Sequence, residues 1–305
     1  MKGPIIIAGF GRSGTTWLSD ILSKALGGLM LFEPFHPLVC ADAADVTYSV
    51  KPTFSNTIKS HWEQLLSGPC TNRWLIRNHL RSPIDTVPEH YIQDIWNKSP
   101  IIGYKTIRTN HLLKPWIRAF PNGAVLYIIR HPLAVLASIN NRQRFWEEFG
   151  WSWHYQKFLK ELREINRPEV KGWLQCEKEL QSPNEQILFM WTVSQEIALS
   201  QVKSISGSVI CYEDLYMSPF EETHKILTLL GHGNRSIHPS YLFEPSLTTH
   251  RTFHNSNTGL LAAPDQLPKI FWESSIKQEE EKSLLELIRR LKPKTPEVLR
   301  YLKEV

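Results

Sequence analysis

The residues best suited to bind an anion lie close together near the N-terminus. Glycines at positions 9, 11 and 14 allow the backbone to turn sharply and to point its N–H groups at a ligand. One cation and three hydroxyl groups share this loop, within the run Arg12-Ser13-Gly14-Thr15-Thr16. A helix that begins near Thr15 would add unpaired backbone donors and the positive end of its dipole. We therefore expect an anion such as a phosphate to bind here.

The loop departs from the common nucleotide-binding motif at one position. Gly9 and Gly14 have the spacing of G-x-x-x-x-G-K-[ST], but Thr15 occupies the place of the lysine. That lysine would contact the β- and γ-phosphates, so its loss argues against ordinary nucleotide triphosphate hydrolysis. Arg12 supplies the cation instead. A glycine-rich turn without a ligand is the alternative, and the convergence of glycines, cation and hydroxyls speaks against it.

Two later segments carry groups that could move a proton or stabilise charge. Glu33 follows the apolar run 29–32 and is either a general base or a solvated loop carboxylate. His36, three residues further on, is the rival base, because a neutral imidazole suits proton transfer at physiological pH. Lys105 follows another apolar run and could stabilise the charge of a transferring group. An ordinary lysine at a strand end is the alternative for Lys105.

The pattern of apolar residues predicts the elements that must hold these groups. Residues 4–8 read as a buried strand, and the apolar positions after Thr15 then recur at helical spacing. Further strands are predicted at 29–32, 101–104, 124–129 and 209–211, and helices at 57–66, 89–97, 112–120, 132–141, 146–165, 183–205, 219–230 and 275–292. We expect 163–179 to be a mobile insertion. The alternation indicates an α/β fold with a central, mostly parallel sheet, in which ligands bind at the carboxyl ends of the strands.

Length and composition limit the classes of function. We expect the 305 residues, 42% of them hydrophobic, to form one domain over 1–305, with a core at 4–230 and a C-terminal loop and helices at 231–305. A net charge of +5 suits anionic ligands but is too small for a nucleic-acid-binding protein. Four cysteines without a C-x-x-C pair indicate neither a metal site nor a redox couple. Without a long apolar run or room for a signal peptide, we expect a cytoplasmic protein with no integral membrane segment.

The anion-binding loop resembles that of a known family. Arg12-Ser13-Gly14-Thr15-Thr16 after a strand is similar to the 5′-phosphosulfate loop of sulfotransferases that use 3′-phosphoadenosine 5′-phosphosulfate (PAPS). Arg130 at the end of the strand 124–129 and Ser138 on the next helix resemble, in order and spacing, the pair that binds the 3′-phosphate. The resemblance implies a P-loop kinase-like architecture, PAPS as donor, 3′-phosphoadenosine 5′-phosphate (PAP) as product, and no metal.

Three further residues resemble positions that bind the adenine and the 3′-phosphate of the donor in this family. Trp17 is similar to an adenine-stacking position, and Tyr212 is similar to the tyrosine that borders the adenine. A basic C-terminal loop closes over the 3′-phosphate in the family, and Arg251 is the match in this sequence. We expect Glu213 and Asp214, which follow Tyr212, to be structural residues that hold neighbouring backbone or basic groups.

Two segments resemble carbohydrate sulfotransferases more than cytosolic ones. Glu33-Pro34 follows an apolar run as in that branch, and Lys105-Thr106-Ile107-Arg108 is similar to its Lys-Thr-Ile-Arg sequence. Cytosolic members have a catalytic histidine where this chain has Ile107. The resemblance implies in-line transfer to the hydroxyl of a sugar or glycolipid, with Glu33 as base and with Lys105 and Arg12 balancing charge. A P-loop kinase and a non-catalytic PAP- or PAPS-binding protein are the alternatives.

Overall fold

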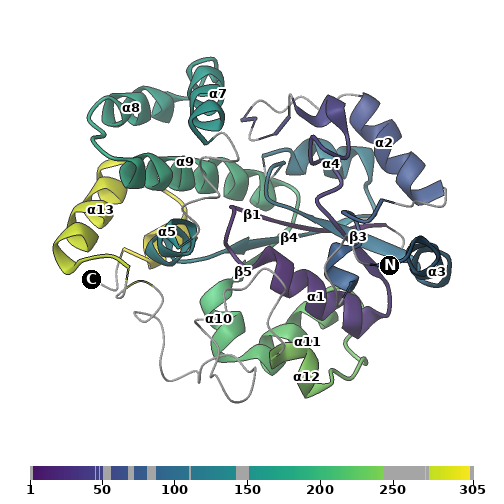
Figure 1. Ribbon diagram of the computed structural model, residues 1–305. Coiled ribbons are helices and arrows are strands. Elements are labelled where there is room, and N and C mark those ends of the chain that lie inside the picture. Colours follow the sequence, from purple (N-terminus) through teal and green to yellow (C-terminus); the bar gives the residue numbers. More distant parts are fainter. Residues whose placement is uncertain are drawn as a thin grey trace.

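Five parallel strands form the centre of the molecule. The computed structural model describes residues 3–44, 46–47, 49–50, 56–67, 72–80, 87–109, 111–141, 151–243, 272 and 275–302. Its strands are β1 (Ile5–Gly9), β2 (Leu29–Phe32), β3 (Ile101–Thr106), β4 (Ala124–Ile129) and β5 (Ser208–Cys211), in the order β2-β3-β1-β4-β5 (Figure 1). Each pairing between these strands is parallel. Their carboxyl ends therefore share one edge of the sheet.

Helices cover both faces of this sheet. The helical elements are α1 (Thr15–Leu26), η1 (Ala41–Ala44), α2 (Asn56–Ser67), η2 (Arg77–His79), α3 (Glu89–Lys98), α4 (Leu113–Ala119), α5 (Pro132–Asn140), α7 (Trp151–Arg163), α8 (Pro168–Glu177), α9 (Pro183–Ser204), α10 (Tyr212–Met217), α11 (Pro219–Leu229), α12 (Pro239–Phe243), α13 (Gln278–Arg290) and α14 (Pro296–Arg300). Figure 1 shows α1 and α10 to α12 on one side of the sheet, and α4 and α9 on the other. The predicted α/β fold class is confirmed.

The strands consist of successive apolar residues because both of their faces are covered. Ile5, Ile6 and Ile7 of β1 have no exposed surface. A strand that is buried on two sides needs apolar side chains at consecutive positions, whereas a strand with one wet face alternates. β1 lies in the middle of the strand order, with β3 on one side and β4 on the other. The loop that follows β1 is thus held by the most buried part of the molecule.

The prediction of a mobile insertion at 163–179 is wrong. This segment contains the regular helix α8. Val170 and Trp173 on this helix are buried, and the indole N–H of Trp173 donates to the carbonyl of Leu291 over 3.1 Å. The two apolar residues are three positions apart and so share one helix face, which leaves charged residues such as Lys171 exposed. The charged residues that suggested a mobile insertion belong to the solvent-exposed side of a packed helix.

Three of the four cysteines lie in the described part of the chain. Cys176 and Cys211 are free thiols there, Cys40 is buried, and Cys70 lies outside that part. Within the same residues, no helix has the length and apolar character needed to cross a bilayer. Nor do three histidine, cysteine, aspartate or glutamate side chains among them gather as metal ligands would.

Two buried histidines make the stability of the fold depend on pH. Burial lowers the pKa of His111 to about 4, and burial with the nearby charge of Arg130 lowers the pKa of His131 to about 3. Histidine in the unfolded chain has its ordinary pKa of 6.5. Between the lowered pKa values and pH 6.5, these two histidines therefore bind protons in the unfolded chain but not in the folded chain. The free energy of unfolding must therefore fall as the pH falls through this window. We expect a loss of about 1.4 kcal/mol per pH unit for each histidine.

Denaturant unfolding at a series of pH values measures this dependence, and His131→Asn is the matched variant. The Nδ1 atom of His131 accepts from the backbone N–H of Leu133 over 3.3 Å, and the amide oxygen of asparagine can replace it. Below pH 6.5, the free energy of unfolding of the variant should change less steeply with pH than that of the original chain, by about 1.4 kcal/mol per pH unit. A slope equal to that of the original chain would show that His131 does not contribute in this way.

Candidate anion-binding and transfer site

The loop between β1 and α1 has the geometry of an anion site. The N–H of Ser13 donates to the carbonyl of Phe10 over 3.1 Å, which closes the turn, and Gly14 has a φ of 93°. The N-cap residue of α1 is Gly14, which has no side chain to cap the first turn, and Thr15 and Thr16 on that turn are buried. The hydroxyl of Ser13 is fully buried and has no hydrogen-bond partner among the described residues. The positive end of this helix thus combines backbone donors with a buried hydroxyl that has no partner among the described residues.

Gly14 cannot be replaced without strain, because both its backbone angle and its surroundings exclude a side chain. A Cβ atom at this position would lie 2.4 Å from Cδ2 of Tyr212. We expect Gly14→Ala to lower the free energy of unfolding by about 2 kcal/mol or more. Gly172→Ala is the control, since a Cβ there meets nothing within 4 Å and the residue lies in α8, where alanine is favoured. Equal stability of the two variants in denaturant unfolding would contradict this account.

Two arginines and one serine meet beside the loop. The Nε of Arg12 donates to Oγ of Ser138 on α5 over 2.9 Å. The Nη1 of Arg130, at the end of β4, donates to the carbonyl of Arg12 over 3.1 Å. Arg130 and Ser138 are 118 and 126 residues from Arg12 along the chain. The fold therefore brings together the two groups of residues that the sequence analysis assigned to separate phosphates.

The aromatic residues Trp17 and Tyr212 lie next to these cations. The guanidinium carbon of Arg130 is 4.3 Å from the ring centroid of Tyr212, and the rings of Trp17 and Tyr212 meet edge to face with centroids 5.6 Å apart. The indole N–H of Trp17 donates to the carbonyl of Leu242 over 3.2 Å, and the residue is buried. Arg251, the remaining predicted residue, lies outside the described part of the chain. The aromatic pair therefore borders the loop on the side of Arg130.

Glu213 on α10 holds the backbone next to Arg130, and residues at the end of α14 hold α10 in turn. The carboxylate of Glu213 accepts from the backbone N–H of His131 over 2.8 Å and from the hydroxyl of Tyr301 over 2.8 Å. Burial raises the pKa of Glu213. Asp214 accepts two bonds from Arg300, over 2.7 and 2.6 Å. The expectation that Glu213 and Asp214 hold backbone and basic groups is confirmed, whereas Arg300 and Tyr301 gave no local signal in the sequence.

Glu33 and Lys105 form a buried pair at the carboxyl ends of β2 and β3. The backbone N–H of Glu33 donates to the carbonyl of Lys105 over 3.0 Å, and the ammonium of Lys105 donates to Oε1 of Glu33 over 2.6 Å. Both side chains are buried. Burial lowers the pKa of Lys105 well below its usual value, with smaller effects from the charges of Arg77 and Arg12, and the charge of Asp20 opposes this shift.

Arg108 binds the other oxygen of Glu33, a role that no local pattern in the sequence predicted. Its guanidinium forms an ion pair with Oε2 of Glu33. The hydroxyl of Thr106 accepts from the backbone N–H of Thr109 over 3.2 Å and so stabilises the turn that carries Arg108. Glu33 itself has a φ of 46°, and Arg12 has a φ of 71°. Such left-handed angles are uncommon in residues other than glycine and often occur at functional sites.

His36 lies close to this pair, and its backbone N–H donates to the carbonyl of Glu33 over 2.9 Å. The Nδ1 of His36 accepts from the backbone N–H of Leu38 over 3.1 Å, so the proton of the neutral ring is on Nε2. Burial, with the charges of Lys105 and Arg77, lowers the pKa of His36 to about 4. The ring is therefore neutral at physiological pH. Its unprotonated nitrogen, Nδ1, already accepts the hydrogen bond from Leu38. The unprotonated nitrogen of His36 and both oxygens of Glu33 therefore each have a partner already.

Comparison with known proteins places the chain in one family. A model of the sulfotransferase family matches residues 4–233, and the chain belongs to this family. Solved structures similar to it include the sulfotransferase domain from the curacin biosynthetic pathway (16% identity, 97% of this chain and 99% of that chain covered, TM-score 0.47). Another is the sulfotransferase domain from the Synechococcus PCC 7002 olefin synthase (15% identity, 97% and 98% covered, TM-score 0.42). No curated protein sequence matches the chain.

Proposed function

We propose that this protein transfers the sulfuryl group of PAPS to the hydroxyl of an acceptor and releases PAP. The observation that carries the proposal is the meeting of Arg12, Ser138 and Arg130 at the uncapped start of α1. This arrangement supplies two cations, a hydroxyl and helix N–H groups to a ligand with more than one phosphate. The buried, unpartnered hydroxyl of Ser13 also fits an anionic ligand.

Each part of the donor would have its own residues. Residues 12–16 would bind the 5′-phosphosulfate through the Arg12 guanidinium, the hydroxyls and the backbone N–H groups. Arg130 and Ser138 would bind the 3′-phosphate, and Arg251 would close over it. Trp17 and Tyr212 would border the adenine. No metal is needed in this proposal, because side chains and backbone donors balance the charge of the phosphates.

The chemistry proceeds in one displacement. Bound PAPS supplies an activated sulfuryl group, whose bond to the 5′-phosphate oxygen breaks as the acceptor oxygen attacks in line. Glu33 would take the proton of the acceptor hydroxyl, because its carboxylate is fixed at the same sheet edge as the anion loop. Lys105 and Arg12 would stabilise the negative charge that develops on the bridging oxygen and the sulfuryl group. Arg108 would hold the carboxylate in place through its ion pair.

The acceptor in this proposal is a sugar or a glycolipid. Glu33-Pro34 and Lys105-Thr106-Ile107-Arg108 support it through their likeness to the carbohydrate sulfotransferases. The side chain of Ile107 cannot act as a base where cytosolic sulfotransferases have a histidine.

Calorimetric titration with PAP in EDTA, beside ATP with Mg²⁺, tests the donor. We expect PAP to bind without metal and ATP with Mg²⁺ to bind more weakly, since Thr15 replaces the lysine that ATP-binding loops use. Binding of ATP with Mg²⁺ and none of PAP would support a P-loop kinase instead. Tight PAP binding without transfer to any hydroxyl acceptor would support a non-catalytic nucleotide-binding protein.

A further inference from the structure

The peptide group that joins Arg130 to His131 lies just beyond the edge of the sheet. The ladder between β4 and β5 runs as far as the pair Ile129 and Cys211. One residue after Arg130, the backbone N–H of His131 donates to Oε1 of Glu213 over 2.8 Å, in place of a neighbouring strand. Because a peptide group is planar, this bond also fixes the carbonyl of Arg130, and with it the backbone from which the arginine side chain extends.

The same turn of α10 supplies the ring against which Arg130 lies. Tyr212, which precedes Glu213, has its ring centroid 4.3 Å from the guanidinium carbon of Arg130. A guanidinium on an aromatic face keeps its charge and its plane is held by the ring. The place of Glu213 therefore sets both the backbone of Arg130 and the aromatic face beside its guanidinium.

The second oxygen of Glu213 is bound by a buried tyrosine of the C-terminal region. The hydroxyl of Tyr301 donates to Oε2 of Glu213 over 2.8 Å. The ring of Tyr301 also meets the ring of His131 edge to face, with centroids 5.1 Å apart. Tyr301 thus contacts both partners of the hydrogen bond that fixes the peptide group after Arg130.

The carboxylate of Glu213 depends on these donors for its charge. Burial raises the pKa of Glu213, while the bonds from His131 and Tyr301 and the charge of Arg130 oppose this rise. Loss of the Tyr301 hydroxyl would leave one buried carboxylate oxygen without its donor. The carboxylate would then turn away or bind a proton, and either change weakens its bond to His131.

We infer that Tyr301 is a positioning residue for the donor, which acts through Glu213 on Arg130 and so on the binding of the 3′-phosphate. The loop for the 5′-phosphosulfate does not depend on it in this way, because the bond from Ser13 to Phe10 closes that turn from within. The inference rests on the proposed function, which assigns Arg130 to the 3′-phosphate.

The test compares two nucleotides that differ only in this phosphate. Adenosine 5′-phosphate (AMP) is PAP without its 3′-phosphate, so the ratio of the two dissociation constants measures the contribution of that group. We expect calorimetric titration of the original chain to show a preference for PAP of at least about tenfold, as charge-assisted contacts provide. In Tyr301→Phe, which keeps the buried ring, the preference should fall at least about threefold, while AMP affinity stays within about twofold.

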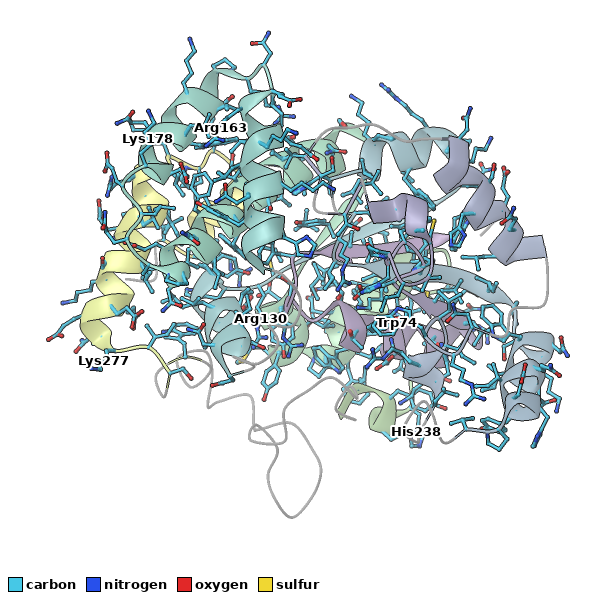
Figure 2. All side chains as sticks on the ribbon, turned by 45° about the horizontal axis from the view of Figure 1, so that its top comes forward. Trp74, Arg130, Arg163, Lys178, His238 and Lys277 are labelled. Atoms are coloured by element: carbon cyan, nitrogen blue, oxygen red, sulfur yellow. The ribbon has the colours of Figure 1, made fainter. Side chains whose placement is uncertain are left out.

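Tyr155→Phe is the matched control. Tyr155 is also buried, and its hydroxyl donates to Oε1 of Glu177 over 3.3 Å in a pair that joins α7 to α8. Figure 2 labels Arg163, at the end of α7, and Lys178, just after α8, well apart from Arg130. This variant loses the same kind of contact between a hydroxyl and a carboxylate, and it should keep the PAP preference of the original chain.

A double variant shows whether Tyr301 acts through Arg130. In Arg130→Ala the side chain that Tyr301 positions is missing, so the further change Tyr301→Phe should alter the PAP preference by less than about twofold. A hydroxyl that only stabilised the fold would weaken the binding of PAP and AMP together, with or without Arg130.

The outcomes separate this inference from the proposed function. An unchanged PAP preference in Tyr301→Phe overturns the inference even when PAP binds as expected. An equal loss of affinity for PAP and AMP overturns it too, because the hydroxyl would then serve the fold as a whole. The proposed function is judged on the original chain alone. Equal binding of PAP and AMP there removes the 3′-phosphate from Arg130, and the inference falls with that assignment.

Discussion

Replacement of Arg130 by alanine should weaken the binding of PAP about tenfold to a hundredfold. The side chain would lose a charge-assisted contact to the 3′-phosphate, and such contacts contribute about 1.5 to 3 kcal/mol. The substitution also removes the donor to the carbonyl of Arg12 and the cation above the ring of Tyr212. Calorimetric titration of PAP into the original chain and Arg130→Ala measures the change.

Two controls make the Arg130 result specific. Arg130→Lys keeps the charge but loses the planar pair of donors, and so should fall between the original chain and Arg130→Ala. Arg235→Ala removes an exposed arginine far along the chain from the loop and should bind PAP as the original chain does. A PAP affinity within about twofold of the original in Arg130→Ala would remove this residue from the donor site.

Glu33→Gln should abolish transfer while it leaves PAP affinity intact. The amide cannot take a proton, and general base catalysis contributes about a hundredfold to ten-thousandfold to the rate. Its oxygen can still accept from the ammonium of Lys105, which is 2.6 Å from Oε1 in the original chain. The rate of PAP release in the presence of PAPS and acceptor, together with PAP calorimetry, separates the loss of chemistry from a loss of binding.

The rival base provides the decisive comparison for Glu33. His36→Asn keeps an acceptor for the backbone N–H of Leu38, and we expect it to reduce turnover much less than Glu33→Gln does. Retained turnover in Glu33→Gln, with loss in His36→Asn, would move the assignment to His36. The reason for expecting the first result is the likeness of Glu33-Pro34 to the carbohydrate sulfotransferases, together with the low pKa of His36, about 4, which makes the imidazole a weak base.

Local sequence signals were sufficient for the anion loop and the framework around it. Glycine spacing, the apolar run of β1 and the helical period after Thr15 lie within one stretch of chain, and the structure forms β1 and α1 there. Arg130 could be placed at a strand end because β4 is an uninterrupted apolar run. Such features depend on neighbours along the chain, which is why the sequence predicts them.

The contacts that complete the site depend on residues far apart in the sequence. Lys105 and Glu33 are 72 residues apart, and Tyr301 is 88 residues from Glu213. Lysine, arginine and tyrosine residues occur throughout the chain, so their identity alone does not indicate which of them reach the site. The stacking of Arg77 on Trp74 depends on the path of residues 72–80 along β2, for which the sequence contains no periodic signal.

Transfer of labelled sulfur from PAPS to an acceptor tests the central claim most directly. The protein is incubated with sulfur-labelled PAPS and a panel of neutral and acidic sugars in EDTA, and Glu33→Gln serves as the matched variant. We predict a labelled sugar and an equal amount of PAP from the original chain, and neither from the variant. Label that stays on PAPS with every acceptor, while labelled ATP with Mg²⁺ passes its phosphate to the same sugars, would contradict the account.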